Sequence, residues 1–192
     1  SIIFSADGSH TLKLDDFDEC YHSSKGAYSE ARHIYIECGV EFLWRKIRET
    51  SDNHSAQDTI EIYDIGLGTA LNAIATIVWQ EEMLSTQNPV PHIRYNGIEK
   101  FPISFEEAIK LNFAEHITEW LQSVGSENVI TAERLQPIFE MIHRCNWEED
   151  VEITPHFTLN KHQGDITTEN GKYFSSKQEN APVLKNWGIS VK

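Results

Sequence analysis

The residues most able to do chemistry lie between residues 62 and 72, where an aspartate is followed by two closely spaced glycines. An apolar, β-branched segment ends in Asp64, and Gly66 and Gly68 follow before a helical pattern begins. Glycine is needed where the backbone takes a positive φ or where a ligand comes close to the chain. A strand, turn and helix of this kind place a small-molecule crevice at the carboxyl end of the first strand of an open α/β sheet. A plain strand-to-helix turn is the alternative.

The spacing of the glycines indicates which ligand the crevice takes. A dinucleotide fingerprint needs a third glycine three residues after the second, and Leu71 stands there. The third small residue is instead Ala70, which gives Asp-x-Gly-x-Gly-x-Ala. This form suits a nucleoside cofactor without phosphates, of which S-adenosylmethionine is the common case.

Three carboxylates stand where parallel strands are expected to end. Glu99 closes the second strand, where an acid can accept hydrogen bonds from both hydroxyls of a ribose. Asp64 either steadies the ammonium of the cofactor or caps the amides of the turn. Asp165 either accepts from the adenine amine or only begins a loop.

The elements that must position these residues follow an α/β order. Hydrophobic periodicity predicts strands over 59–64 and 92–98 with a helix over about 69–84 between them. The other predicted elements are a hairpin over 2–14 with an Asp-Gly turn, helices over 26–38, 40–48 and 132–147, helical spacing with breaks over 104–124, and strands over 151–154 and 156–163. Gly39 is expected just past the end of a helix. The predicted fold is α/β, with a Rossmann-like sheet, an added N-terminal β-hairpin and helices, and a C-terminal part that looks incomplete.

Composition and charge narrow the class of protein. The net charge of −14 argues against a broad nucleic-acid surface, and the basic stretch 45–48 is expected to be the solvated end of a helix. The odd number of cysteines and the lack of a signal-peptide pattern favour reduced thiols and a cytoplasmic protein. No apolar run approaches the ~20 residues that span a bilayer. A metal site is not expected, because Cys20, His22, His33 and Cys38 lack the close cysteine pairs of zinc sites.

Several stretches together resemble one family, the S-adenosylmethionine-dependent methyltransferases that finish the aminomethyl group on the wobble uridine of tRNA. The stretches are 7–12, 21–23, 26–27, 30–33, 66–72, 97–104 and 164–165. The Tyr-His-Ser and Glu-Lys-Phe-Pro blocks are more specific than the glycine motif. The resemblance implies a single S-adenosylmethionine-binding domain over 1–192, with an N-terminal hairpin and helical extension (1–50), a Rossmann-like core (58–166) and an unassigned segment (167–192).

The resemblance also implies the reaction, the cofactor and the partners. The reaction would be N-methylation of aminomethyl-uridine in tRNA with S-adenosylmethionine, after an FAD-dependent oxidase that is separate or fused. The cofactor-binding residues it implies are Tyr21, Asp64, Gly66, Gly68, Thr69, Asn72, Glu99, Lys100 and Asp165, and the substrate-side residues are His22, Ser23 and Glu30. It assigns no catalytic residue, because the Asp-Ala-Phe-x-Pro segment and the basic Gly-Lys-Arg stretch of the family are missing from this sequence.

Ala70 departs from the family, which usually has glycine at this position, and the difference is expected to affect the binding of the cofactor. Alanine fits if its φ is negative, so binding is expected to be weakened rather than abolished. Two other functions stay open. One is a cofactor-binding remnant without turnover. The other is a methyltransferase of the same fold that acts on another small amine, because an acidic surface repels such a substrate less than it repels RNA.

Overall fold

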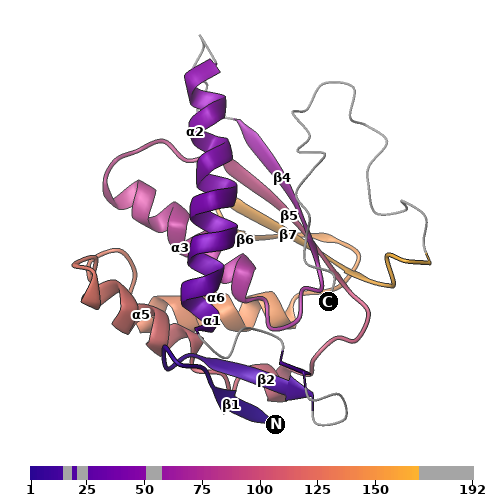
Figure 1. The fold of residues 1–192 in the computed structure, drawn as a ribbon. Helices are drawn as coiled ribbons and strands as arrows, with labels where there is room; N and C mark the ends of the chain where they lie inside the picture. The colour runs from indigo at the N-terminus through magenta and orange to yellow at the C-terminus, as the bar shows by residue number, and fades with distance from the viewer. Residues whose placement is uncertain (15–18, 21–25, 51–57, 169–192) are drawn as a thin grey trace.

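The main layer of the structure, a computed structural model that describes residues 1–14, 19–20, 26–50 and 58–168, is a four-stranded sheet. The strand order is β4-β5-β7-β6 (Figure 1). β4 (Thr59–Ile65), β5 (His92–Glu99) and β7 (Phe157–Gln163) run parallel, and β6 (Asp150–Thr154) pairs antiparallel with β7. The sequence predicts all four strands, with bounds that differ by one residue. The carboxyl ends of the three parallel strands therefore meet at one edge.

The helix α3 (Leu71–Ser85) connects β4 to β5 and is buried on almost every side through residue 80. Its sequence is apolar nearly all round in that stretch, as a helix enclosed by other elements requires. Buried apolar residues of the strands and of the other helices complete the core, and Tyr95 stacks on Phe157 with ring centroids 5.3 Å apart. This strand-helix-strand core confirms the predicted α/β class.

One long helical run lies on the same side of the sheet as α3 (Figure 1). It consists of α1 (Ala27–Ala31), the π-helix η1 (Arg32–Val40) and α2 (Glu41–Thr50), joined end to end. The prediction that Gly39 follows the end of a helix is wrong, because the chain continues through it into α2.

The winding of η1 also changes which residues of this run are buried. Ile34, Tyr35 and Cys38, which have α-helical spacing in the sequence, are exposed, and Ile36 is buried. A π-helix bonds residue i to i+5, so an apolar face inferred from 3.6 residues per turn is misplaced. The side chain of Arg32 pairs with Glu82 of α3 and holds the run against the core.

The N-terminal strands form a separate antiparallel sheet of β1 (Ile2–Phe4), β2 (His10–Leu14) and β3 (Glu19–Cys20). The hairpin of β1 and β2 confirms the prediction, and its turn contains Gly8 with φ +86°. The sequence does not predict β3, because a two-residue strand carries no periodicity.

The carboxylate of Asp7 in this turn ties the hairpin to α1. It accepts hydrogen bonds from the hydroxyls of Ser5, Ser9 and Ser29 and from the backbone N–H of Ser9 and Ser29. Burial alone would raise the pKa of Asp7, but these donors hold it well below its ordinary value.

Three helices lie between β5 and β6: α4 (Phe105–Ala108), α5 (Phe113–Ser123) and α6 (Ala132–Arg144). Ser104 is the predicted N-cap of α4 and forms a capping box with Glu107. α6 ends three residues before the predicted 147, because Cys145 is extended. Among the described residues, no helix combines the length and apolar character needed to cross a membrane.

Candidate functional site

The glycine turn after β4 lies on the end of β5. The backbone N–H groups of Gly66 and Leu67 donate to the carbonyl of Ile98 at 2.8 and 3.2 Å. Gly66 and Gly68 have φ values of +86° and +51°, which favour glycine. A Cβ on Gly97 would stand 2.8 Å from the side chain of Leu67, so the absence of a side chain at residue 97 lets Leu67 pack closely on β5. The predicted turn at the carboxyl end of the first strand is confirmed.

The carboxylate of Glu99 holds this turn in place. Its Oε2 accepts from the N–H of Gly68 at 2.9 Å, and its Oε1 accepts from the N–H of Phe101 at 2.7 Å. The side chain is buried, with a residue exposure of 9 %. Because a carboxylate oxygen has two lone pairs, Glu99 keeps the capacity to accept from hydroxyls of a ligand. The contact between Glu99 and a ribose stays a prediction. The sequence did not reveal that Glu99 also has a structural role, which is to hold the glycine turn.

Ala70, just before α3, has a left-handed backbone with φ +59° and ψ +21°. The condition under which alanine was expected to fit, a negative φ, is therefore not met. A left-handed conformation costs a residue with a Cβ about 1–2 kcal/mol. The alanine methyl is completely buried, so packing holds the residue in this conformation.

Ala70→Gly is expected to leave stability within about 0.5 kcal/mol of wild type or to increase it, because relief of strain offsets the loss of a buried methyl. Ala73→Gly, at a buried position inside α3, has no strain to relieve and should destabilise by about 2 kcal/mol. Urea unfolding of both variants measures the difference. Equal destabilisation would show that Ala70 carries no strain.

Asp64 is the centre of a second polar group at the end of β4. Its Oδ2 accepts from the hydroxyl of Tyr95 at 2.7 Å, and the side chain of Asn72 lies close enough to lower its pKa. Burial, with a smaller contribution from the nearby Glu99 carboxylate, raises the pKa of Asp64 to about 6 against the opposing effects of Tyr95 and Asn72. The buried Oδ1 of Asn72 has no hydrogen-bond partner among the described residues. An unsatisfied acceptor beside a carboxylate suits a donor such as an ammonium group.

Tyr35 of η1 reaches this group from the helical run. The side chain of Asn72 lies close enough to lower the pKa of its phenol. Burial of the phenol raises its pKa, the Asp64 carboxylate adds to the shift, and the exposed Glu30 adds a smaller part. The helical run therefore brings Tyr35, with Glu30 nearby, toward Asp64 and Asn72 of the core. Sequence reasoning missed Tyr35, because α-helical spacing assigned it to the buried face.

A cavity of about 60 Å³ lies beside Glu99. Its lining residues are Leu67, Gly68, Glu99, Pro102, Ile103, His143, Trp147 and Lys161. Pockets that enclose whole small-molecule ligands have volumes of roughly 300–1,000 Å³. The cavity can therefore enclose only part of a nucleoside cofactor, and the remainder would lie against the open edge of the sheet.

Lys161 and His143 are the polar residues of this cavity that sequence reasoning missed. The buried Nζ of Lys161 donates to the carbonyl of His143 at 3.1 Å and lies 4.9 Å from the ring centroid of Trp147. Burial lowers the pKa of His143 to about 4, so its imidazole is neutral at pH 7. Its Nε2 is 3.3 Å from the carbonyl of Thr69, which links α6 to the glycine turn. The alternation Phe157, Leu159, Lys161 was the signal that could have placed Lys161 on the buried face.

Lys100 and Asp165, both predicted to bind the cofactor, contact each other. The Nζ of Lys100 lies 2.8 Å from Oδ2 of Asp165, whose Oδ1 accepts from the N–H and hydroxyl of Thr167. Hydrogen bonds from Lys100 and Thr167 hold the pKa of Asp165 at about 2. Both alternatives for Asp165 stay open, since it begins a turn and lies at the strand ends. Tyr21, His22 and Ser23 lie outside the described residues.

No family model matches the chain, but individual proteins do. Three curated relatives carry the name tRNA 5-methylaminomethyl-2-thiouridine biosynthesis bifunctional protein MnmC. The relative from Leptospira borgpetersenii is 32 % identical over 97 residues, or 50 % of this chain and 13 % of the relative. The one from Burkholderia multivorans is 25 % identical over 150 residues (77 % and 20 %), and the one from Aliivibrio fischeri is 27 % identical over 121 residues (58 % and 17 %). The chain thus spans a fifth or less of these relatives.

A solved structure supports the fold. The crystal structure of MNMC2 from Aquifex aeolicus matches with a TM-score of 0.53 and 22 % identity, over 86 % of this chain and 42 % of that chain. At this identity the likeness concerns the fold alone. The chain is therefore similar in sequence to the bifunctional proteins of tRNA 5-methylaminomethyl-2-thiouridine biosynthesis, as its motifs predicted, and shares the α/β fold of MNMC2.

Proposed function

We propose that this chain is the S-adenosylmethionine-binding domain of a tRNA methyltransferase that converts aminomethyl-uridine at the wobble position to methylaminomethyl-uridine. The observation that carries the proposal is the pair of buried carboxylates, Asp64 and Glu99, at the ends of adjacent parallel strands beside a glycine turn. The similarity to proteins named for tRNA 5-methylaminomethyl-2-thiouridine biosynthesis supports the substrate.

The donors and acceptors present match the chemical groups of this cofactor. Glu99 can accept from ribose hydroxyls, and Asp64 with the unsatisfied Oδ1 of Asn72 can accept from the ammonium of the methionine part. The backbone of Gly66 and Gly68 has no side chains to prevent close approach. When bound, S-adenosylmethionine supplies an electrophilic methyl group on a sulfonium, which is attracted to a crevice with two carboxylates.

The protein then has to align the substrate amine and receive its proton. Alignment of donor and acceptor supplies much of the rate in such a displacement. The amine reacts when unprotonated, so a carboxylate near the mouth of the crevice is needed as a proton acceptor. Glu30 is exposed beside Tyr35 and is the described carboxylate that suits this role. Tyr21, His22 and Ser23 are proposed to complete the substrate side.

The test combines cofactor binding with methyl transfer. Calorimetry measures the affinity of the chain for S-adenosylmethionine, and a radiolabel assay measures transfer to tRNA that lacks only the final methyl. Fully modified tRNA is the control. Binding with transfer supports the proposal, and failure to bind the cofactor overturns it.

A cofactor-binding remnant is the second candidate. The lack of the family's acidic segment favours it, because the substrate half is then incomplete. Cofactor binding without transfer to tRNA would support this candidate. Transfer to a small amine but not to tRNA would instead support a methyltransferase of the same fold with another substrate, which the net charge of −14 favours.

A further inference from the structure

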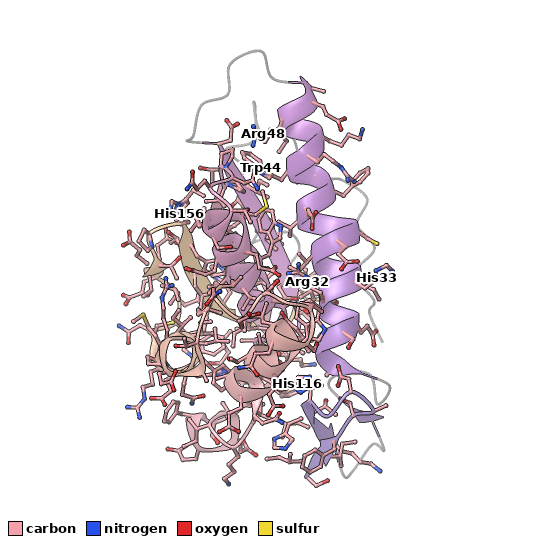
Figure 2. The ribbon with its side chains drawn as sticks, turned by 90° about the vertical axis from the view of Figure 1, so that its left-hand side faces the viewer. Arg32, His33, Trp44, Arg48, His116 and His156 are labelled. Carbon is pink, nitrogen blue, oxygen red and sulfur yellow. The ribbon has the colours of Figure 1, made fainter. Side chains whose placement is uncertain are left out.

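Three side chains on the outer face of η1 are arranged as nucleophile, base and orienting acid. The Sγ of Cys38 lies 4.0 Å from Nε2 of His33, and Nδ1 of His33 lies 3.0 Å from Oε2 of Glu37. Figure 2 shows His33 on the side of the helical run that faces away from the sheet. In activated nucleophiles a base contacts the nucleophile and a third group orients the base. The arrangement thus has the components of an activated thiol.

The π-helical winding brings these residues together. In an α-helix, residues five apart point roughly 140° away from each other around the axis, so His33 and Cys38 would lie on different faces. A π-helix bonds residue i to i+5, and the N–H of Glu41 makes such a bond to the carbonyl of Ile36 at the end of η1. The contact between His33 and Cys38 is therefore a consequence of η1 and could not be read from α-helical spacing.

Exposure separates Cys38 from the other described free thiol. The side chains of His33 and Glu37 are 68 % and 49 % exposed, and Cys38 is exposed beside them. Cys145 is half-buried, its thiol donates to the carbonyl of Ile142 at 3.3 Å, and burial raises its pKa against the opposing effect of the nearby Lys161 ammonium. Reactive cysteines are accessible and lie beside histidine or cationic groups, whereas buried cysteines are inert. Cys145 is thus an internal reference within the same chain.

We propose that Cys38 is a modification site that undergoes thiol–disulfide exchange with small disulfides, with His33 as base and Glu37 as positioning residue. The proton of the Cys38 thiol passes to Nε2 of His33, and Sγ attacks one sulfur of the small disulfide. A new S–S bond forms at Cys38, and the S–S bond of the reagent breaks. The other half of the reagent leaves as a thiolate and takes the proton from His33. The small disulfide is the only oxidant that the step requires.

Glutathione disulfide is the probe for the test. The full chain, with Cys20→Ser to simplify the reaction, is incubated with the reagent, and mass spectrometry of peptides follows Cys38 and Cys145 over time. Cys38 is expected to react at least about tenfold faster than Cys145. His33→Asn should slow the reaction of Cys38 about tenfold and leave that of Cys145 unchanged. Equal rates at the two cysteines, or no effect of His33→Asn, would overturn the proposal.

Glu37→Gln distinguishes positioning from simple electrostatics by the sign of its effect. A carboxylate near a thiol disfavours the thiolate, so its removal alone would speed the reaction. If Glu37 orients His33, its removal slows the reaction instead, and Glu37→Asp retains part of the rate. A faster reaction of Glu37→Gln would exclude the positioning role. All three side chains are exposed, so circular dichroism of the variants should match wild type.

Discussion

Replacing Glu99 by glutamine is expected to weaken the binding of S-adenosylmethionine about 10- to 100-fold. Hydrogen bonds to a charged group contribute about 1.5–3 kcal/mol, and the amide of glutamine can accept at one atom only. The NH₂ group of the introduced glutamine would also face the N–H of either Gly68 or Phe101, so one end of the turn would lose its acceptor. Calorimetric titration with the cofactor measures the change.

Glu152→Gln is the matched control for this prediction. Glu152 is exposed on β6, so the same chemical change there should leave the affinity unchanged. Urea unfolding of Glu99→Gln should show a loss of about 1–3 kcal/mol, because a buried donor is left unsatisfied. If Glu99→Gln bound the cofactor as tightly as wild type, Glu99 would have only its structural role in the turn.

Replacing Asp64 by asparagine is expected to stabilise the protein relative to wild type as the pH rises from 4 to 7. Burial raises the pKa of Asp64 from 3.8 to about 6, so the folded chain holds this proton more tightly than the unfolded chain. The contribution of Asp64 to the stability of wild type therefore falls as the pH rises between these two values, by up to about 3 kcal/mol. The introduced asparagine does not titrate and still accepts from the hydroxyl of Tyr95, so the variant avoids this loss.

Urea unfolding of wild type and Asp64→Asn at pH 4, 5.5 and 7 tests the prediction. Asp150→Asn, the same change at an exposed residue paired with Arg94, is the control and should show no such trend. Parallel pH dependences of wild type and Asp64→Asn would contradict it. A variant that gains stability at pH 7 but loses affinity for S-adenosylmethionine would identify Asp64 as a group retained for binding, because perturbed carboxylates concentrate at functional sites.

Local patterns were sufficient to predict the elements that surround the site. The β-branched runs of β4 and β5, the glycine turn and the Ser104 cap are encoded by residues within a few positions of one another. The position of Glu99 beside the turn also followed, because parallel strands end at the same edge of a sheet. The winding of η1 did not follow, since helical periodicity assumes 3.6 residues per turn and a π-helix departs from it.

The sequence by itself determined the α/β class, the glycine turn and the carboxylates near the ends of β4 and β5, because each depends on residue types at short spacing. Only the tertiary structure decided the left-handed backbone of Ala70 and the arrival of Lys161 and His143 beside Glu99. It also decided the raised pKa of Asp64. These properties arise when segments far apart in the chain pack together, exclude water and restrict the backbone. Local sequence patterns do not predict such contacts.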